Sequence, residues 1–237
     1  MLAGPIVILT GAGISKESGL DTFRCEGGIW SQVKIEDVCS PQGYRRNPKL
    51  VHDFYNARRQ QLESGEAHPN PAHEALARLE REWPAPVILV TQNIDDLHER
   101  AGSSNIIHMH GELMKGRCDA CGTVLDWSGE MSVSSTCPAC ARVGKVRPHI
   151  VWFGEVPLHM PRIFSLLDEC ALFVSIGTSG NVYPASGFVS HVRNRGGVPT
   201  VELNLEPSLG ASLFDDAIYG PASQVVPEFV AELLDRL

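Results

Sequence analysis

Four short apolar runs, each bounded by Gly, Pro, Asn or Asp, constrain the fold of this chain most strongly. They cover residues 6–9, 87–90, 172–176 and 198–205. Continuous apolar runs of this length are typical of parallel strands that are buried on both faces of a sheet. Amphipathic stretches lie between them and suit crossover helices, so we predict an α/β fold with a Rossmann-like, doubly wound parallel sheet. The predicted helices cover residues 48–62, 71–83, 161–170, 184–195 and 223–237.

Two stretches break this alternation. Residues 25–65 hold a glycine-rich segment and one helix, whereas residues 112–146 contain few apolar runs and two CxxC pairs. We predict that this helical insertion and this metal-binding module together form a small domain. The large domain, built around the parallel sheet, would then consist of residues 1–24, 66–111 and 147–237.

The two CxxC pairs predict a structural zinc site. Fifteen residues separate Cys118 and Cys121 from Cys137 and Cys140. Two such turns facing each other give the four-thiolate tetrahedron that Zn²⁺ prefers, with no position left for a reactive water. Redox-active dithiols are the alternative, but a thioredoxin-type motif needs one pair rather than two. The other cysteines are interpreted as ordinary small apolar residues: Cys25, Cys39 and Cys170.

Composition excludes several classes of protein. A chain of 237 residues with 43% hydrophobic residues can bury one good core, or a core with a small satellite. The formal net charge of −8 argues against a dedicated binder of nucleic acid or of a membrane surface. No apolar segment approaches the roughly 20 residues of a membrane span, and Met1 leads almost directly into the first predicted strand. We therefore expect a cytoplasmic protein without nucleic-acid or membrane partners.

Gly11 and Gly13 follow the first apolar run, as in a turn that binds a dinucleotide pyrophosphate. The third glycine of that fingerprint is replaced by Lys16, and no acidic residue about 20 residues further on is well placed to hold a ribose. Asn204, at the end of another predicted strand, could take that role. A dinucleotide bound at this turn could thus serve a dehydrogenase reaction or a reaction other than hydride transfer.

Polar residues also follow the other predicted strands. Gln92, Asn93 and Asp95 come after the second run, and Thr178 and Ser179 come after the third. Because ligands bind beyond the carboxyl ends of strands in an open parallel sheet, we expect these side chains to face one crevice. Asn93 or Asp95 could instead merely cap a short helix, but capping explains only one polar residue.

Two histidines follow at His108 and His110. A general base is the better functional interpretation for one of them, since imidazole titrates near neutrality, although a single histidine is more often structural than catalytic.

Taken in order, the motifs resemble those of the sirtuins, which are NAD-dependent protein lysine deacylases. They are GAGIS, ESG and TFR in residues 11–24, TQNIDDLH at 91–98, HG at 110–111, the two CxxC pairs, VWFGE at 151–155, GTS at 177–179 and NLE at 204–206. The resemblance covers essentially the whole chain. It implies a Rossmann-type domain and a zinc module, with NAD and an acyl-lysine peptide meeting between them.

The resemblance also implies the roles of individual residues. His110 would be the general base and Asn93 a second catalytic residue, whereas His108 would not be catalytic. Ser179 and Asn204 would hold the adenosine half of NAD. The implied NAD-binding residues are Gly11, Ala12, Gly13, Ile14, Ser15, Phe23, Arg24, Trp30, Gln92, Asn93, Ile94, Asp95, His110, Gly177, Thr178, Ser179, Asn204, Leu205, Glu206 and Ala222.

The implied reaction consumes NAD. The acyl-lysine oxygen attacks the nicotinamide ribose, nicotinamide leaves, His110 takes a proton from the ribose hydroxyls, and water completes the release of lysine and O-acyl-ADP-ribose. The substrate peptide would pair as a strand with the VWFGE segment. The residues concerned are Val151, Phe153, Gly154 and Glu155.

Tyr55 and Arg58 lie three residues apart, on neighbouring parts of one helical face. An arginine fork beside a phenol suits a carboxylate, although such a pair on an arbitrary helix is more often a solvated surface with an aromatic anchor. Here the pair resembles the Tyr-x-x-Arg signature of sirtuins that remove malonyl, succinyl and glutaryl groups. We therefore expect desuccinylase and demalonylase activity alongside deacetylase activity, with Arg58 rather than Arg59 holding the carboxylate.

Two other classes of function are compatible with an NAD site and a zinc site. A zinc-containing NAD dehydrogenase would produce NADH, and a non-catalytic NAD sensor or zinc-ribbon interaction module would bind partners without turnover. Mono-ADP-ribosyl transfer is a minor variant of the deacylase hypothesis. We expect a monomer whose partners are acylated proteins or peptides.

Overall fold

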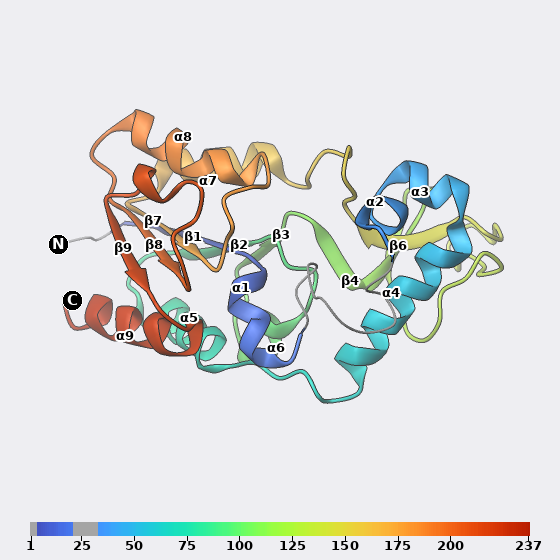
Figure 1. The fold of residues 1–237 in the computed structure, drawn as a ribbon, viewed down its shortest axis with the longest axis horizontal. Coiled ribbons are helices and arrows are strands. Elements are labelled where there is room, and N and C mark those ends of the chain that lie inside the picture. The colour runs from blue at the N-terminus through green and yellow to red at the C-terminus, as the bar shows by residue number, and fades with distance from the viewer. Residues whose placement is uncertain (1–3, 21–32) are drawn as a thin grey trace.

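The computed structural model describes residues 4–20 and 33–237. Its larger lobe is built around a six-stranded sheet (Figure 1). Neighbouring strands all pair in parallel, which confirms the predicted fold class. The order across the sheet is β3 (Ile106–His108), β2 (Val87–Thr91), β1 (Ile6–Thr10), β7 (Leu172–Ile176), β8 (Thr200–Asn204) and β9 (Asp216–Tyr219).

Helices cover both faces of this sheet (Figure 1). Ile6 and Ile8 of β1 face a core that includes α5 (Pro71–Glu82) and α9 (Ala222–Leu234). Val7 and Leu9 face the opposite core, against α7 (Met160–Glu169) and α8 (Phe188–Arg195). Side chains on both sides of one strand are therefore buried, as the apolar runs predicted. Among the described residues, no helix is both long and apolar enough to span a bilayer.

The predicted strands and helices are present with small shifts at their ends, and the differences lie in short elements. The glycine turn continues as α1 (Ala12–Ser15) and η1 (Lys16–Ser18) rather than as a long helix. The helix predicted from residue 184 is divided into η2 (Ala185–Gly187) and α8. The sequence analysis missed β9, because this partly exposed edge strand has no apolar run. Two further short elements are α6 (Leu97–Ala101) and η3 (Ala211–Leu213).

A second, three-stranded antiparallel sheet forms the small lobe with nearby helices (Figure 1). The helices and strands of this lobe are α2 (Ile35–Val38), α3 (Pro41–Arg46), α4 (Pro48–Glu63), β4 (Gly111–Cys118), β5 (Val124–Asp126) and β6 (Val146–Ile150). We had grouped residues 147–150 with the large domain. They pair with β4 instead, so their hydrogen bonds extend the small sheet and not the parallel one.

The four predicted zinc ligands come together beside this small sheet. Cys118 Sγ lies 3.7 Å from Cys140 Sγ, and Cys121 Sγ lies 3.9 Å from Cys137 Sγ. All four sulfur atoms lie within 4.8 Å of one another. In a four-thiolate zinc site with Zn–S bonds near 2.3 Å, sulfur atoms stand roughly 3.8 Å apart. The cysteine cluster therefore fits a structural Zn²⁺ ion.

Two buried histidines lie against each other between α5, α6 and the parallel sheet. His73 of α5 accepts a hydrogen bond from the Asn70 backbone N–H (3.3 Å), which completes the cap of that helix. His98 of α6 bonds to the Thr10 hydroxyl (3.0 Å), and the two imidazole rings lie 4.9 Å apart. Burial lowers the pKa of His73 to about 4 and lowers that of His98 well below its usual range. Both side chains are therefore neutral in the folded protein at neutral pH.

Acidification should destabilise the fold through these neutral histidines. Between its ordinary pKa of 6.5 and its folded pKa of about 4, His73 binds a proton only in the unfolded chain. The free energy of unfolding therefore falls as the pH falls through this window. His73→Gln keeps an acceptor for the helix cap and removes the titrating group. From about pH 7 to pH 5, this variant should lose about 1 to 2 kcal/mol less stability than the wild type, measured by denaturant unfolding. His68→Gln, at an exposed position, is the control, and an equal loss in the wild type and His73→Gln would refute the idea.

Loss of the cysteine cluster should unfold the small lobe first. Cys137→Ser should abolish binding of the tightly held zinc ion at the cysteine cluster, because a tetrahedral site loses a thiolate. Hydrogen exchange should then become fast in residues 118–146 while β1 and β2 stay protected. Cys170→Ser is the matched control, since this buried thiol donates to the Leu167 carbonyl and accepts from Arg195 Nη1, and it is not part of the cysteine cluster. Retention of this tightly bound ion by Cys137→Ser would argue against the four-thiolate site.

Candidate active site

The carboxyl ends of β1, β2, β7 and β8 meet at one edge of the parallel sheet (Figure 1). The predicted cofactor residues that follow these strands accordingly lie in neighbouring turns. The turn after β1 begins at Gly11, the turn after β2 at Gln92, and the turn after β7 at Gly177. Asn204 is the last residue of β8. The sequence analysis thus placed these groups at the correct edge.

The turns after β1 and β7 are interlocked through glycine backbone. Gly13 N donates to Gly177 O (2.9 Å), and Gly11 N donates to Ile176 O (3.0 Å). A Cβ atom on Gly13 would lie 2.7 Å from Gly177 Cα, so a side chain there would clash. Gly177 has a φ of +63°, and a Cβ atom there would lie 2.4 Å from Ile14 N. The glycines are therefore needed for this backbone contact as well as for any approach of a phosphate.

Buried side chains connect the glycine turn to the turn after β2. The Asn93 amide donates to Gly11 O (3.2 Å) and to Ser15 Oγ (3.1 Å). Ser15 Oγ donates in turn to Asp95 Oδ2 (3.2 Å), and Asp95 Oδ1 accepts from Leu97 N. Burial raises the pKa of Asp95 to about 6. Asp95 thus supports the start of α6 and also fixes the position of Asn93 through Ser15.

The two histidines contact the same turn but differ in environment. His110 Nδ1 lies 3.1 Å from Gln92 O, and burial lowers the pKa of His110. His108 Nδ1 lies 3.4 Å from Asn93 O, and its Nε2 lies 2.6 Å from Glu99 Oε1. Burial also acts to lower the pKa of His108, but the hydrogen bond and charge of Glu99 raise it overall. His110 is therefore the neutral imidazole that can accept a proton at neutral pH.

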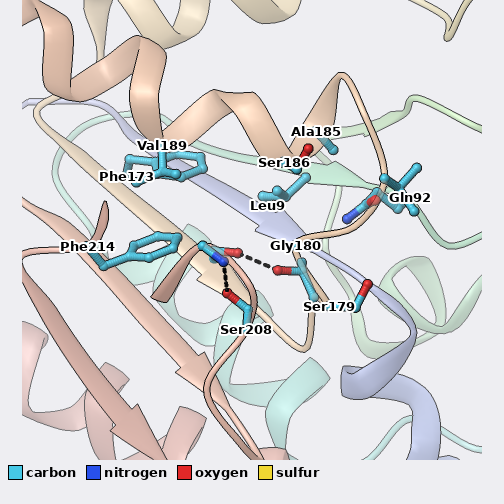
Figure 2. Close-up of a pocket in the computed structure, with 14 residues that line it drawn as sticks. Leu9, Gln92, Phe173, Ser179, Gly180, Ala185, Ser186, Val189, Ser208 and Phe214 are labelled. Atoms are coloured by element: carbon cyan, nitrogen blue, oxygen red, sulfur yellow. Dashed lines mark hydrogen bonds between the residues drawn. The ribbon is translucent and has the colours of Figure 1, made fainter. Parts of the chain in front are cut away.

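The turn after β7 forms one wall of a small cavity (Figure 2). Gln92 and Ser179 lie on one side of it, and Phe214 lies across from them. Asn204 Nδ2 donates to Thr178 O (2.6 Å), which joins the ends of β7 and β8. Asn204 Oδ1 accepts from Leu205 N. Asn204 therefore lies beside the turn that carries Ser179. Leu205 and Glu206 are exposed, whereas Ile14 is buried in the core.

Glu17 is a residue of this region that the sequence analysis left without a role. Its carboxylate accepts hydrogen bonds from Ser223 N (3.0 Å) and Ser223 Oγ (2.7 Å). This contact holds the start of α9, and with it Ala222, beside η1. No local pattern signals it, since the two residues are 206 positions apart.

Tyr55 is fully buried in the small lobe, and its hydroxyl is held from two sides. It accepts a hydrogen bond from Trp152 Nε1 (3.1 Å) and lies 3.4 Å from Cys39 Sγ. Arg58, one turn further along α4, lies with its guanidinium 4.8 Å from the centre of the Phe54 ring. Arg59 is used differently, because it donates to Gly129 O and Asn56 Oδ1. The sequence analysis missed Cys39 and Trp152 as the partners of Tyr55.

The segment 151–155 connects Tyr55 to the histidine turn. Val151 N donates to His110 O (2.9 Å), and Phe153 N donates to Cys39 O (2.9 Å). Glu155 accepts from Arg147 (2.8 Å) and from Trp152 N (2.9 Å), so its carboxylate braces the segment. The Phe153 side chain is 61% exposed, which leaves it available to a ligand. Ile94 also packs against the cluster that contains Tyr55 and Trp152, so the small lobe reaches the turn after β2.

Three predicted cofactor residues lie outside the described parts of the chain: Phe23, Arg24 and Trp30.

Comparison with known proteins gives a consistent result. The sequence matches the Sir2 family over residues 11–184. The NAD-dependent protein deacylase of Salmonella typhimurium is 55% identical over 238 residues, which cover 100% of this chain and 87% of that protein. The protein of the same name from Yersinia pseudotuberculosis is 56% identical over 229 residues, which cover 97% of this chain and 82% of that protein.

Solved structures agree with the sequence comparison. A Sir2 homologue in complex with NAD has a TM-score of 0.88 and 34% identity, covering 98% of this chain and 90% of that chain. A Sir2 protein bound to a myristoylated histone peptide has a TM-score of 0.73 and 31% identity, covering 98% of this chain and 91% of that chain. The chain belongs to the Sir2 family.

Proposed function

We propose that this chain is an NAD-dependent protein-lysine deacylase that removes succinyl and malonyl groups as well as acetyl groups. One observation carries the proposal: His110 stands between the turn after β2 and the segment that leads to Tyr55. Its Nδ1 lies 3.1 Å from Gln92 O, and its carbonyl accepts from Val151 N (2.9 Å). Next to Val151, Trp152 donates to Tyr55 (3.1 Å). The general base would thus lie directly between the cofactor-binding turn and the pocket for the acyl group.

NAD would bind across the interlocked glycine turns. The backbone N–H groups and the start of α1 suit a pyrophosphate, and the residues after β2 suit the nicotinamide ribose. Ser179, Asn204 and Ala222 would surround the adenosine half. The relatives named as NAD-dependent deacylases and the Sir2 homologue in complex with NAD support this cofactor. NAD would be consumed in the reaction, because it supplies an ADP-ribosyl group and releases nicotinamide.

His110 would take a proton from a ribose hydroxyl. Burial lowers its pKa, so the imidazole is neutral and able to accept a proton at neutral pH. The carbonyl of Gln92 fixes the ring through Nδ1, which leaves Nε2 for the substrate. Asn93 is held by Gly11 and Ser15 and would position the nicotinamide end. His108 is a poorer candidate, since Glu99 occupies its Nε2.

The acyl preference would come from Arg58 with Tyr55. A guanidinium in a half-buried site binds a carboxylate more strongly than at the surface, because less water competes. Trp152 and Cys39 hold the phenol, so the pocket wall is ordered before any substrate arrives. Arg59 is engaged by Gly129 and Asn56, which supports Arg58 as the carboxylate ligand.

The acylated peptide would lie along residues 151–155. In this segment the N–H groups of Val151, Trp152, Phe153 and Glu155 already donate within the chain. Among the described hydrogen bonds, the carbonyls of Val151 and Phe153 accept none, so they are the groups that an extended peptide would pair with. The related structure with a myristoylated histone peptide supports a peptide substrate.

Arg58→Met should remove the preference for acidic acyl groups. The kcat/KM for a succinylated peptide should fall by roughly 30-fold to 1000-fold, which corresponds to about 2 to 4 kcal/mol for a charge-assisted pair. The kcat/KM for the acetylated form of the same peptide should change only a few-fold. Arg59→Met is the matched control, and it should leave the ratio of the two values unchanged. An unaltered ratio in Arg58→Met would exclude Arg58 as the carboxylate ligand.

His110→Ala should lower deacylation by roughly 10²-fold to 10⁴-fold, the usual contribution of a general base, and leave NAD binding within a few-fold. Mass spectrometry of an acyl peptide, with and without NAD, measures the loss of the acyl group and the release of nicotinamide. His191→Ala, at a partly exposed position on α8, is the control. NADH formation would instead indicate a dehydrogenase, mass added to a protein would indicate ADP-ribosyl transfer, and binding without turnover would indicate a sensor module.

A further inference from the structure

We propose that Glu99, His108 and Glu112 form a second metal site, which binds one divalent transition-metal ion such as Zn²⁺. The three side chains come from α6, β3 and β4, and their ligand atoms lie within 4.8 Å of one another. The site is separate from the four-cysteine cluster and has a different donor set. One imidazole and two carboxylates suit ions of intermediate hardness, and bind them less tightly than four thiolates bind zinc.

The imidazole of His108 is held in the way that is usual for a metal ligand. Its Nδ1 lies 3.4 Å from the carbonyl oxygen of Asn93, and its Nε2 faces Glu99 Oε1 at 2.6 Å. Ligating histidines typically donate one ring N–H to a carbonyl or carboxylate while the other nitrogen binds the ion. Metal binding would replace the proton that Nε2 and Glu99 share, and one proton would be released.

A cavity provides access to the three ligands. Glu99, His108 and Glu112 all line it, together with His149, His159 and Arg162. His149 lies directly opposite Glu112 in the pairing of β4 with β6, so it is a candidate for a fourth protein ligand. If His149 does not bind the ion, water would complete its coordination.

One interaction competes with the ion. Lys115 Nζ lies 2.8 Å from Glu112, and this pair must separate for Glu112 to bind a metal. The two side chains are 35% and 28% exposed, and ion pairs with such access to water contribute little stability. The lysine can swing into solvent, and a divalent charge would replace its single charge beside the two carboxylates.

The proposed site lies where the parallel sheet meets the antiparallel sheet. His108 belongs to β3 of the parallel sheet and Glu99 to helix α6, whereas Glu112 belongs to β4 of the antiparallel sheet. His108 and Glu112 stand two residues before and after His110. A bound ion would therefore cross-link the two sheets on both sides of His110, whatever reaction that residue performs.

The test is metal stoichiometry on the full chain with its cysteine site already loaded. Titration with Zn²⁺ against a weak chromophoric chelator should reveal a second ion per chain in the wild type. Glu99→Gln/Glu112→Gln should weaken this second ion by more than about tenfold and keep the first. His191→Gln is the matched control, because His191 pairs with Asp168 (2.7 Å) in a similar way without a third ligand in the described structure. A wild-type titration that ends at one ion would overturn the proposal, as would a double variant that keeps the second.

A second measurement needs no variant. Co²⁺ added to the zinc-loaded wild type should give visible absorption without the thiolate-to-cobalt band that a cysteine site produces. A zinc-soaked crystal of the wild type should show anomalous scattering between the three side chains. A thiolate-to-cobalt band alone, or no anomalous peak at saturating zinc, would overturn the proposal even if the double variant failed to fold.

Discussion

The contact between the turns after β1 and β7 is the constraint on which the candidate site depends. Gly13 donates to Gly177 O at 2.9 Å, and neither residue has room for a Cβ atom. This contact fixes Ser15 at the end of α1, and Ser15 accepts from Asn93. The turn after β2 is thereby tied to the turns after β1 and β7. Backbone geometry at two glycines therefore sets the positions of polar side chains that follow these strands.

Two histidines in one short segment acquire opposite properties from their neighbours. Both rings direct Nδ1 towards a carbonyl of the turn after β2, so the local backbone does not distinguish them. The two histidines differ through Glu99, whose carboxylate raises the pKa of His108 against the effect of burial. In the described part of the chain no such carboxylate acts on His110, and burial lowers the pKa of that imidazole. The first histidine is thus suited to binding a cation or a proton, and the second to accepting a proton during a reaction.

Much of this arrangement could be predicted from sequence, for a physical reason. Strands that are buried on both faces are largely apolar, so β1, β2 and β7 are visible as runs, and the edge where they end follows from the topology. The spacing of the cysteines likewise identifies a metal site. The partners of Tyr55 and of Glu17 could not be predicted, because Trp152 and Ser223 approach them only through tertiary packing. Strands β9 and β6 were missed because neither contains a continuous apolar run. Strand β9 is a short, partly exposed edge strand, and β6 includes Arg147 and His149.

The hydrogen bonds of residues 151–155 have a consequence for association between copies of the chain. Most N–H groups of this segment donate inward, to His110, Cys39 and Glu155, so its open side presents mainly acceptors. Two acceptor-rich edges cannot form a ladder with each other, since each lacks the donors that the other needs. The segment is thus protected against the edge-to-edge pairing that leads exposed strands to aggregate, while a peptide with free N–H groups can still pair with it.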